Sequence, residues 1–378
     1  MNFYQEILTA KKMILALAPM DGVSDFAFRS INKKYGQMDL LFTEFASVEG
    51  ICHSRSTQIL NHFDFDETQR PLVAQIFGKT PIYFKQVAVL LCELGVDGID
   101  INMGCPSSTV SGHGSGAGLI QTPILAQEII QAVQTGIKDW SEGLNLEDCP
   151  DISEQMQASV LVKKKKFALI DAKANAKANA KAYIKRQKLP TVSVKTRIGY
   201  AHEEIASWLP YLLEMRPAAI SLHARTFKQG YSGEADWSVI GRAATLIKNT
   251  DPSVIFLGNG DVSDYEQAQK KVAQYGVDGV LIGRASFGKP FIFLPQEKRH
   301  QFLAEKNIFQ IALEHAQLYE ATYAQDEKYS FLPMRKHLAW YTRGVKEAAI
   351  IRAELVRTNS ALEVAQILQK YHLNEKND

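Results

Sequence analysis

Polar side chains follow each of eight short apolar segments along the first three quarters of the chain. Apolar segments of this kind are typical of buried parallel strands, and the chemistry of parallel barrels lies at the carboxyl ends of their strands. A random set of strand ends would not be this polar, so the pattern predicts an active site there. The residues at these ends are Pro19, Met20 and Asp21, Glu44, Gln75, Asn102 with Cys105, Lys195 with Arg197, His223 with Arg225, Asn259, Gly260 and Asp261, and Gly283 with Arg284.

Two of the strand ends form glycine-containing turns, GNGD at 258–261 and GRASFG at 283–288. Backbone N–H groups in such turns can approach a phosphate closely. In a barrel of eight strands and eight helices, the turns after the seventh and eighth strands are the usual phosphate position. Because both turns fall at those strands, the sequence predicts a ligand that carries a phosphate.

The elements that position these residues alternate between apolar segments and amphipathic helical patterns. Eight such units, mostly about 25 to 35 residues apart, predict an α/β fold of the (β/α)8 TIM-barrel type over residues 1–295. Residues 296–378 contain three or four helical patterns and no strand, which predicts a small helical-bundle domain. The apolar segments are 14–19, 40–45, 72–78, 98–104, 192–197, 218–225, 254–261 and 279–285.

Composition excludes several classes of protein. The 378 residues are 46% hydrophobic and 22% charged, which is ordinary for a globular chain and unlike disordered, collagen-like or coiled-coil sequences. Four cysteines form no C-x-x-C pair, so we expect neither disulfides nor a metal site. This cysteine usage indicates a reducing compartment. The sequence shows no signal peptide, and its apolar segments are too short to cross a bilayer. We expect a cytoplasmic protein with no membrane contact.

Charge is unevenly distributed. Residues 163–188 carry a net charge of +9, against −7 for the rest of a chain whose total is +2, and residues 328–357 hold seven Lys and Arg against two Glu. Such blocks indicate a polyanionic partner, although each alone is also typical of a solvated surface. The first block belongs to an insertion at about 138–189, between the fourth and fifth strands. As a loop from a helix to a strand, it is expected at the barrel face opposite the active site.

Several motifs together resemble the tRNA-dihydrouridine synthases, which are flavoproteins that reduce a uracil ring in transfer RNA. The resemblance covers the whole barrel through LAPMDGVSD, VAQIFG, DGIDINMGCP, VSVKTRIG, LHARTFKQGYSGEADW, LGNGDV and GVLIGRASFGKPFIF, and MRKHLAWY resembles the family's C-terminal helical domain. Two departures are visible. The loop after Cys105 lacks a lysine that many members carry two or three positions past the proline, and the insertion is outside the usual pattern.

The resemblance implies a chemistry that these residue types can perform. Saturating the C5=C6 bond of uracil takes a hydride at C6 and a proton at C5, and a reduced flavin must supply the hydride. A thiol can give up a proton near neutral pH, so Cys105 is the expected acid, with a buried apolar role as the alternative. NADPH or NADH would reduce the flavin. We expect FMN rather than FAD, since the sequence has no dinucleotide G-x-G-x-x-G.

The resemblance also implies roles for the other strand-end residues. Lys195 would stabilise negative charge on the reduced flavin ring, and Gln75 would bond its pyrimidine edge. His223 would bond the ring or phosphate, with a satisfied core histidine as the alternative. Asn102 and Arg197 would bind the uracil. The remaining contacts expected for the flavin are Pro19, Met20, Asp21, Asn259, Gly260, Asp261, Gly283 and Arg284.

The expected substrate is tRNA, not DNA, with the target base extruded into the pocket. In the tail, Lys336, Trp340 and Arg343 share one helical face, where Trp340 would contact either RNA or the core. We expect a monomer. Competing interpretations are an FMN barrel that reduces a small molecule, a non-catalytic RNA-binding module, and a dihydrouridine synthase that acts on ribosomal RNA.

Two interpretations remain open for the insertion. Its acidic first half and its lysine-rich second half could pair with each other, which would make it a solvated appendage. Alternatively, Lys173, Lys177, Lys181 and Lys185, spaced four apart, would extend the RNA-binding surface along one side of a helix.

Overall fold

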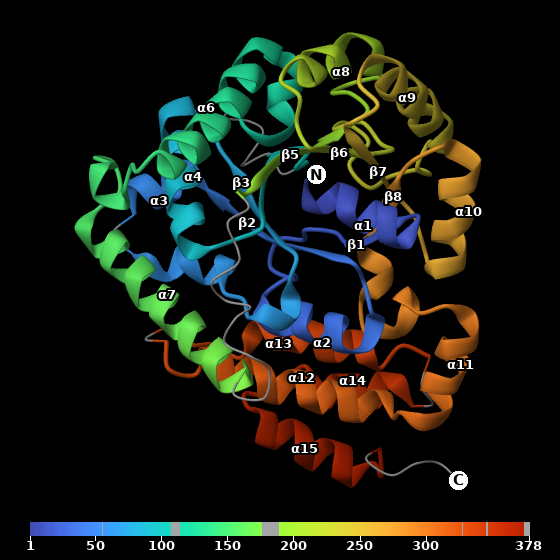
Figure 1. The fold of residues 1–378 in the computed structure, drawn as a ribbon. Coiled ribbons are helices and arrows are strands. Elements are labelled where there is room, and N and C mark those ends of the chain that lie inside the picture. The colour runs from blue at the N-terminus through green and yellow to red at the C-terminus, as the bar shows by residue number, and fades with distance from the viewer. Residues whose placement is uncertain (55, 107–113, 176–188, 327, 345–346, 374–378) are drawn as a thin grey trace.

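The computed structural model describes the chain except for residues 55, 107–113, 176–188, 327, 345–346 and 374–378. Eight parallel strands form a closed barrel in sequence order, with β1 paired to β8 (Figure 1). The predicted TIM barrel is therefore confirmed. The strands are β1 Ile14–Leu17, β2 Leu40–Ser47, β3 Leu72–Phe77, β4 Gly98–Met103, β5 Thr191–Arg197, β6 Ala219–His223, β7 Ile255–Asn259 and β8 Gly279–Ile282.

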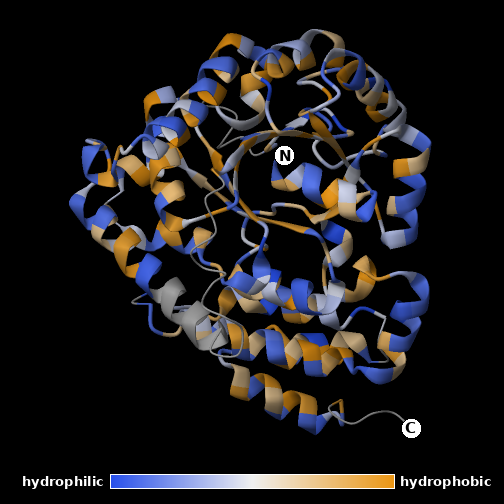
Figure 2. Ribbon diagram, in the orientation of Figure 1, coloured by the Kyte–Doolittle hydropathy of each residue, from blue (hydrophilic) through white to orange (hydrophobic). Residues whose placement is uncertain are grey.

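Helices surround the barrel, and Figure 2 shows apolar residues concentrated on the strands that they cover. One helix, α1 (Phe3–Lys11), precedes β1 and lies in front of the barrel in Figure 1. Its Tyr4 hydroxyl reaches into the barrel and donates to Ser193 Oγ of β5 at 3.1 Å. The other helices of the barrel are α2 Phe26–Gly36, α3 Val48–His53, α4 Pro81–Leu94, α6 Pro123–Ser141, α8 Ile205–Glu214, α9 Trp237–Thr250 and α10 Tyr265–Tyr275.

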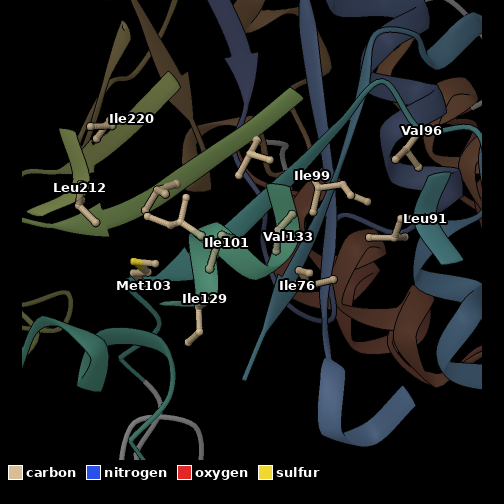
Figure 3. Packing of buried hydrophobic residues seen from close by; sticks show 14 of the residues in the cluster. Ile76, Leu91, Val96, Ile99, Ile101, Met103, Ile129, Val133, Leu212 and Ile220 are labelled. Atoms are coloured by element: carbon tan, nitrogen blue, oxygen red, sulfur yellow. The ribbon is translucent and has the colours of Figure 1, made fainter. Parts of the chain in front are cut away.

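β4 shows how a strand divides its side chains between the two sides of the barrel wall. Ile99 and Ile101 face outward and pack in the core between the strands and helices such as α4 and α6 (Figure 3). The alternate residues face the barrel interior, where Gln75 Nε2 donates to Asp100 Oδ2 at 2.7 Å and Asn102 Nδ2 donates to Gln75 Oε1 at 3.0 Å. The period of two therefore places the polar residues of neighbouring strands together inside the barrel.

The chain continues from β8 into five helices among the residues described after 295. They are α11 Gln296–Glu305, α12 Ile308–Tyr323, α13 Leu332–Tyr341, α14 Ala348–Leu355 and α15 Ala361–Lys370. Helices α12 to α15 share a second apolar cluster, which also contains Ala27 and Ile31 of α2. The helical region is thus anchored on one helix of the barrel (Figure 1).

The first half of the insertion packs against the barrel, so the prediction of a solvated appendage is wrong for these residues. A short 3-10 turn, η4 (Leu146–Asp148), leads into α7 (Glu154–Asn175), and both contact α4. The buried side chains of this segment are Leu146, Cys149, Ile152, Met156 and Val160.

The first lysines of the basic block at 163–188 pair with acids of the barrel rather than with the insertion's own acidic half. Lys163 Nζ lies 2.5 Å from Asp64 Oδ1, and Lys164 Nζ lies 2.7 Å from Glu93 Oε2 of α4. From there α7 runs along the flank of the barrel towards the helical region (Figure 1). Most of the predicted lysine stripe falls in 176–188, outside the described residues.

Two buried histidines of the helical region predict a loss of stability in acid. His315 of α12 is 0% exposed and His337 of α13 is 1% exposed. Burial lowers the pKa of His315 to about 3 and that of His337 well below its usual value. A histidine that takes up its proton only on unfolding destabilises the fold by about 1.4 kcal/mol per pH unit below its unfolded pKa of about 6.5. The pair should therefore contribute a loss of roughly 2–3 kcal/mol per pH unit as the pH falls below about 6.

Urea unfolding of the wild type and of His337→Phe, at about pH 7.5 and about pH 5, measures this contribution. Neither ring nitrogen of His337 has a hydrogen-bond partner among the described residues, and its ring packs against Phe28 and Trp340. Phenylalanine should therefore keep the packing and lose the protonation site. The variant should show a shallower pH dependence by about 1.4 kcal/mol per pH unit. An unchanged dependence would mean that other groups cause the acid sensitivity.

Candidate active site

A cavity of about 940 Å³ lies at the carboxyl ends of the strands, on the side of the barrel predicted from the sequence. All fourteen residues predicted for the site line this cavity, although they come from seven different strand ends. They are Pro19, Met20, Asp21, Gln75, Asn102, Cys105, Lys195, Arg197, His223, Asn259, Gly260, Asp261, Gly283 and Arg284.

Among the lining residues that the sequence did not predict for the site are the large side chains of Phe45, Tyr231, Phe287 and Arg343. Phe45 escaped because the pairing of β2 with β3 shifts between Phe42 and Phe45, and a bulge of this kind reverses which residues face inward. The reading of polar strand ends had selected Glu44, which is buried outside the cavity lining and whose Oε2 lies 3.3 Å from His62 Nδ1. Arg343 comes from the end of α13, so only the tertiary fold brings it to the cavity.

Cys105 is held at the cavity by a turn that the side chain of Asn102 organises. Asn102 Oδ1 accepts the backbone N–H of Gly104 at 3.0 Å and of Cys105 at 2.9 Å. Arg197 Nε donates to the Gly104 carbonyl at 2.6 Å from the opposite side. Cys105 itself is partly exposed, which rules out the alternative of a buried apolar role. The positions of the missing family lysine lie in 107–113, outside the described residues.

Arg197 is 2% exposed and uses its Nε and Nη1 donors on the protein backbone. Besides Gly104, its Nη1 donates to the carbonyls of Thr226 and Gly230, each at 3.0 Å. These bonds tie the turn after β4 to the loop after β6. Burial is the main cause that lowers the pKa of Arg197 to about 10, so its guanidinium remains charged at neutral pH.

Lys195 is a cation that lines the cavity. Burial, followed by the nearby charge of Arg197, lowers its pKa to about 8. Its ammonium makes no hydrogen bond or ion pair with any residue that the structure describes, although Asp100 and Cys105 act on it through space. A half-buried ammonium without a bonded partner is costly unless a ligand supplies one. The arrangement is therefore that of a site for an electron-rich or anionic group.

His223 lies beside these cations and stays neutral. Burial first, and then the charges of Lys195 and Arg197, lower its pKa well below the usual value. Its ring makes no hydrogen bond to the described residues, and it lines the cavity next to Tyr231. The alternative of a histidine satisfied within the core is not what the structure shows. A neutral imidazole can offer one donor and one acceptor to a ligand.

The glycine turn after β7 is built without room for a side chain. Gly260 has φ +129°, and a Cβ there would lie 2.8 Å from the Ala235 Cβ. Trp237 Nε1 donates to the Gly260 carbonyl at 2.8 Å, and Asn259 Nδ2 donates to the Leu281 carbonyl of β8 at 2.9 Å. The turn is thus fixed to the neighbouring strand, and its backbone is open to a close ligand.

Arg284 lies in the turn after β8 and forms an ion pair with Asp261 of the turn after β7. Its Nη2 lies 3.1 Å from Asp261 Oδ1, while the other carboxylate oxygen of Asp261 lies 2.5 Å from Nη2 of Arg225. Arg284 is also 4.8 Å from the ring centroid of Tyr231. Two arginines for one carboxylate leave a net positive charge beside the glycine backbone, which suits a phosphate.

The helical region reaches the rim of the cavity through α13. Trp340 stacks on Phe287 with ring centroids 3.9 Å apart and an angle of 10°, and Lys336 donates to the Gly22 carbonyl. Trp340 thus packs against the barrel and is partly buried, as the core alternative predicts, while its contact with RNA stays a prediction. Arg343 is exposed and lines the cavity, so of the three residues on this helical face it is the one that remains open to a ligand.

A sequence model of the family described as Dihydrouridine synthase (Dus) matches residues 16–139 and 163–377. The chain belongs to the dihydrouridine synthase family. The predicted family is therefore confirmed, and with it the class of enzyme, an oxidoreductase. None of the helices among the described residues is long and apolar enough to cross a membrane.

Curated relatives match over nearly the whole chain. It is 31% identical to the probable tRNA-dihydrouridine synthase 2 of Bacillus subtilis (strain 168), over 98% of this chain and 96% of that protein. It is 30% identical to the probable tRNA-dihydrouridine synthase of Staphylococcus aureus (strain COL), over 100% of this chain and 98% of that protein. The second alignment includes the insertion, although the family match leaves out 140–162. The insertion is therefore shared with at least some relatives.

The cavity fits the flavin that the family implies. Lys195 is an ammonium that lacks a bonded partner among the described residues, and it lines the cavity. The glycine backbone at 258–261 and the guanidinium of Arg284 offer a phosphate site at one end. Lys195 and Arg284 thus provide two positive charges in one cavity, as a ring that gains electrons and carries a phosphate tail requires.

Proposed function

We propose that the enzyme is an FMN-dependent tRNA-dihydrouridine synthase, which uses NADPH to reduce the C5=C6 bond of uridines in tRNA. One observation carries the proposal: the thiol of Cys105 and the ammonium of Lys195 line the same cavity as the glycine turn after β7 and the guanidinium of Arg284. Flavin, when bound, supplies the hydride for C6. The residues of the chain supply the proton for C5, orient the uracil and the flavin, and provide the positive charge beside the flavin ring.

Cys105 gives the proton to C5. A thiol with an unperturbed pKa of about 8.5 can act as an acid near neutral pH. Only the amide nitrogen of Asn102 is available to the uracil, because its carbonyl oxygen is occupied by the turn that presents Cys105. Its second N–H remains the group that faces the base. Arg197 holds the same turn from the other side and lines the substrate end of the cavity.

Lys195 and His223 act on the flavin ring. The ammonium stabilises the negative charge that the ring carries when reduced, and the neutral imidazole offers a hydrogen bond. Gln75 is fixed by Asp100 and Asn102 and has one N–H and one lone pair left for the edge of the ring. Pro19, Met20 and Gly283 also line the cavity.

The flavin content tests the cofactor. The protein should purify yellow, and the released flavin should chromatograph as FMN, because the turns after β7 and β8 offer a site for one terminal phosphate. Denaturing the protein and identifying the flavin by retention time and mass measures this. A colourless protein that takes up no added FMN would contradict the proposal, and FAD as the released cofactor would contradict the choice of FMN.

The basic part of the insertion should contribute to tRNA affinity through charge alone. Changing Lys173, Lys177, Lys181 and Lys185 to glutamine should leave turnover at saturating tRNA within twofold and flatten the salt dependence of binding. Each lost phosphate contact reduces the slope of log K against log salt by about 0.9. We use substitutions because deletion of 142–186 would uncover the apolar face of α4. Filter binding at several salt concentrations measures the slope. An unchanged slope would show that these lysines do not touch RNA.

A further inference from the structure

A second cavity of about 550 Å³ opens beside the first, beyond the turn after β8. Ser263, Arg284, Ala285, Phe287 and Arg343 line both cavities, so the two lie side by side at this turn. Its other walls come from α11 and from the segment that leads into it. None of the roles described above uses this space.

The rim of the second cavity is strongly basic. Lys289 and Arg343 are exposed, and their side chains make no hydrogen bond or ion pair with the residues that the structure describes. Arg284 adds a third positive charge where the cavities join. The remaining cation, Arg299, is already held by Asp264 and by Glu266, at 3.9 and 3.2 Å. Lys289 and Arg343 are thus available to an anion.

The floor of this cavity is apolar. It is formed by Phe287, Phe291, Ile292 and Leu303, and Leu303 is 49% exposed. Phe287 is held flat by its stack on Trp340. An apolar floor under a basic rim fits a planar base that carries phosphates. The chain of an RNA substrate, by contrast, is expected to follow the exposed rim rather than fill a recess.

We propose that the second cavity binds the adenosine 2′-phosphate half of NADPH while its nicotinamide end enters the first cavity. The inference rests on the proposed function, in which a nicotinamide nucleotide reduces the flavin. Lys289 and Arg343 bind the 2′-phosphate, which NADH lacks, and the apolar floor receives the adenine. The chain therefore selects NADPH over NADH by charge at a place separate from the reacting atoms.

Lys289→Glu tests this assignment, with Lys270→Glu as the matched control. Both lysines are exposed and both changes alter the net charge equally, but Lys270 lies on α10 outside the lining of either cavity. Anaerobic stopped-flow reduction of the bound flavin, without tRNA, gives the apparent Kd for each nucleotide. Lys289→Glu should raise the Kd for NADPH about tenfold, the loss expected for one charged hydrogen bond, and leave that for NADH within twofold. Lys270→Glu should change neither.

Binding of 2′,5′-ADP to the flavin-loaded protein, followed by calorimetry, gives a readout that needs no turnover. The wild type and Lys270→Glu should bind it, and Lys289→Glu should bind it at least tenfold more weakly. Equal weakening of NADPH and NADH, or unaltered 2′,5′-ADP binding, would overturn the assignment. So would a loss of tRNA affinity in Lys289→Glu with NADPH binding intact, because the cavity would then belong to the RNA surface. If neither nucleotide reduces the flavin, the proposal that a nicotinamide nucleotide is the reductant is wrong. The binding of 2′,5′-ADP still tests separately whether the second cavity binds an adenosine 2′-phosphate.

Discussion

Replacing Cys105 with alanine should abolish dihydrouridine formation while the protein still binds flavin and NADPH still reduces it. The thiol is the group that we assign to protonate C5, and a positioned general acid contributes about 10²–10⁴-fold to a rate. The substitution removes the acid but none of the contacts that we assign to the flavin. The rate of dihydrouridine formation in single turnover, followed by mass spectrometry of digested tRNA, should fall by about that factor.

Cys92→Ala is the matched control. Cys92 is 3% exposed within α4 and lies outside the cavity lining. Its loss should leave the rate of dihydrouridine formation within twofold of wild type. Anaerobic flavin reduction by NADPH should be unchanged in both variants. A Cys105→Ala enzyme that turns over at the wild-type rate would show that another group delivers the proton.

Replacing Lys195 with methionine should weaken flavin binding and remove a pH dependence. Its pKa of about 8 is that of the protein without ligand, and a bound electron-rich group would raise it. The charge is therefore present below about pH 8, and flavin affinity should fall as the pH rises above this value. Loss of one charge-assisted hydrogen bond should weaken flavin binding by about 1.5–3 kcal/mol at neutral pH.

Fluorescence titration of the flavin-free protein with FMN, from about pH 6.5 to about pH 9.5, measures this affinity. Wild type should show constant affinity up to about pH 8 and a decline above it, whereas Lys195→Met should show neither the tighter binding nor the decline. Lys195→Arg keeps the charge at all these pH values. It should therefore retain the tighter binding and lose only the decline at high pH. If Lys195→Met bound FMN as tightly as the wild type does, with the same pH profile, the role of Lys195 in flavin binding would be contradicted.

Much of the fold and the cavity could be predicted because they depend on short-range patterns. Apolar segments at regular spacing determine the barrel, and the carboxyl end of each strand determines which polar residues share a cavity. The contacts of those residues depend on the tertiary structure. Asn102, for example, sits where the sequence predicts, but its carbonyl oxygen holds the Cys105 turn. Its assigned roles, like those of Cys105 and Lys195, stay predictions.

The missed features have identifiable causes. The bulge in β2 exchanged Phe45 for Glu44 at the cavity, and nothing in the alternation of the strand marks a bulge. The packed half of the insertion did leave a signal, since Ile152, Met156 and Val160 recur at a spacing of four, as on one face of a helix. The lysine-rich pattern that follows them is stronger, and it favoured a solvated or RNA-binding segment over a packed one. The contact of Trp340 with Phe287 joins two distant segments and has no local signature.

The central claim is that the reduced flavin of this enzyme passes its electrons to uridine in tRNA. The most direct measurement mixes anaerobically reduced protein with tRNA that lacks dihydrouridine and follows flavin oxidation and dihydrouridine together. We expect one dihydrouridine to form for each flavin oxidised, and no oxidation with free uridine. Flavin that is oxidised by ribosomal RNA or by a small molecule but not by tRNA, or that is oxidised by tRNA without forming dihydrouridine, would contradict the account.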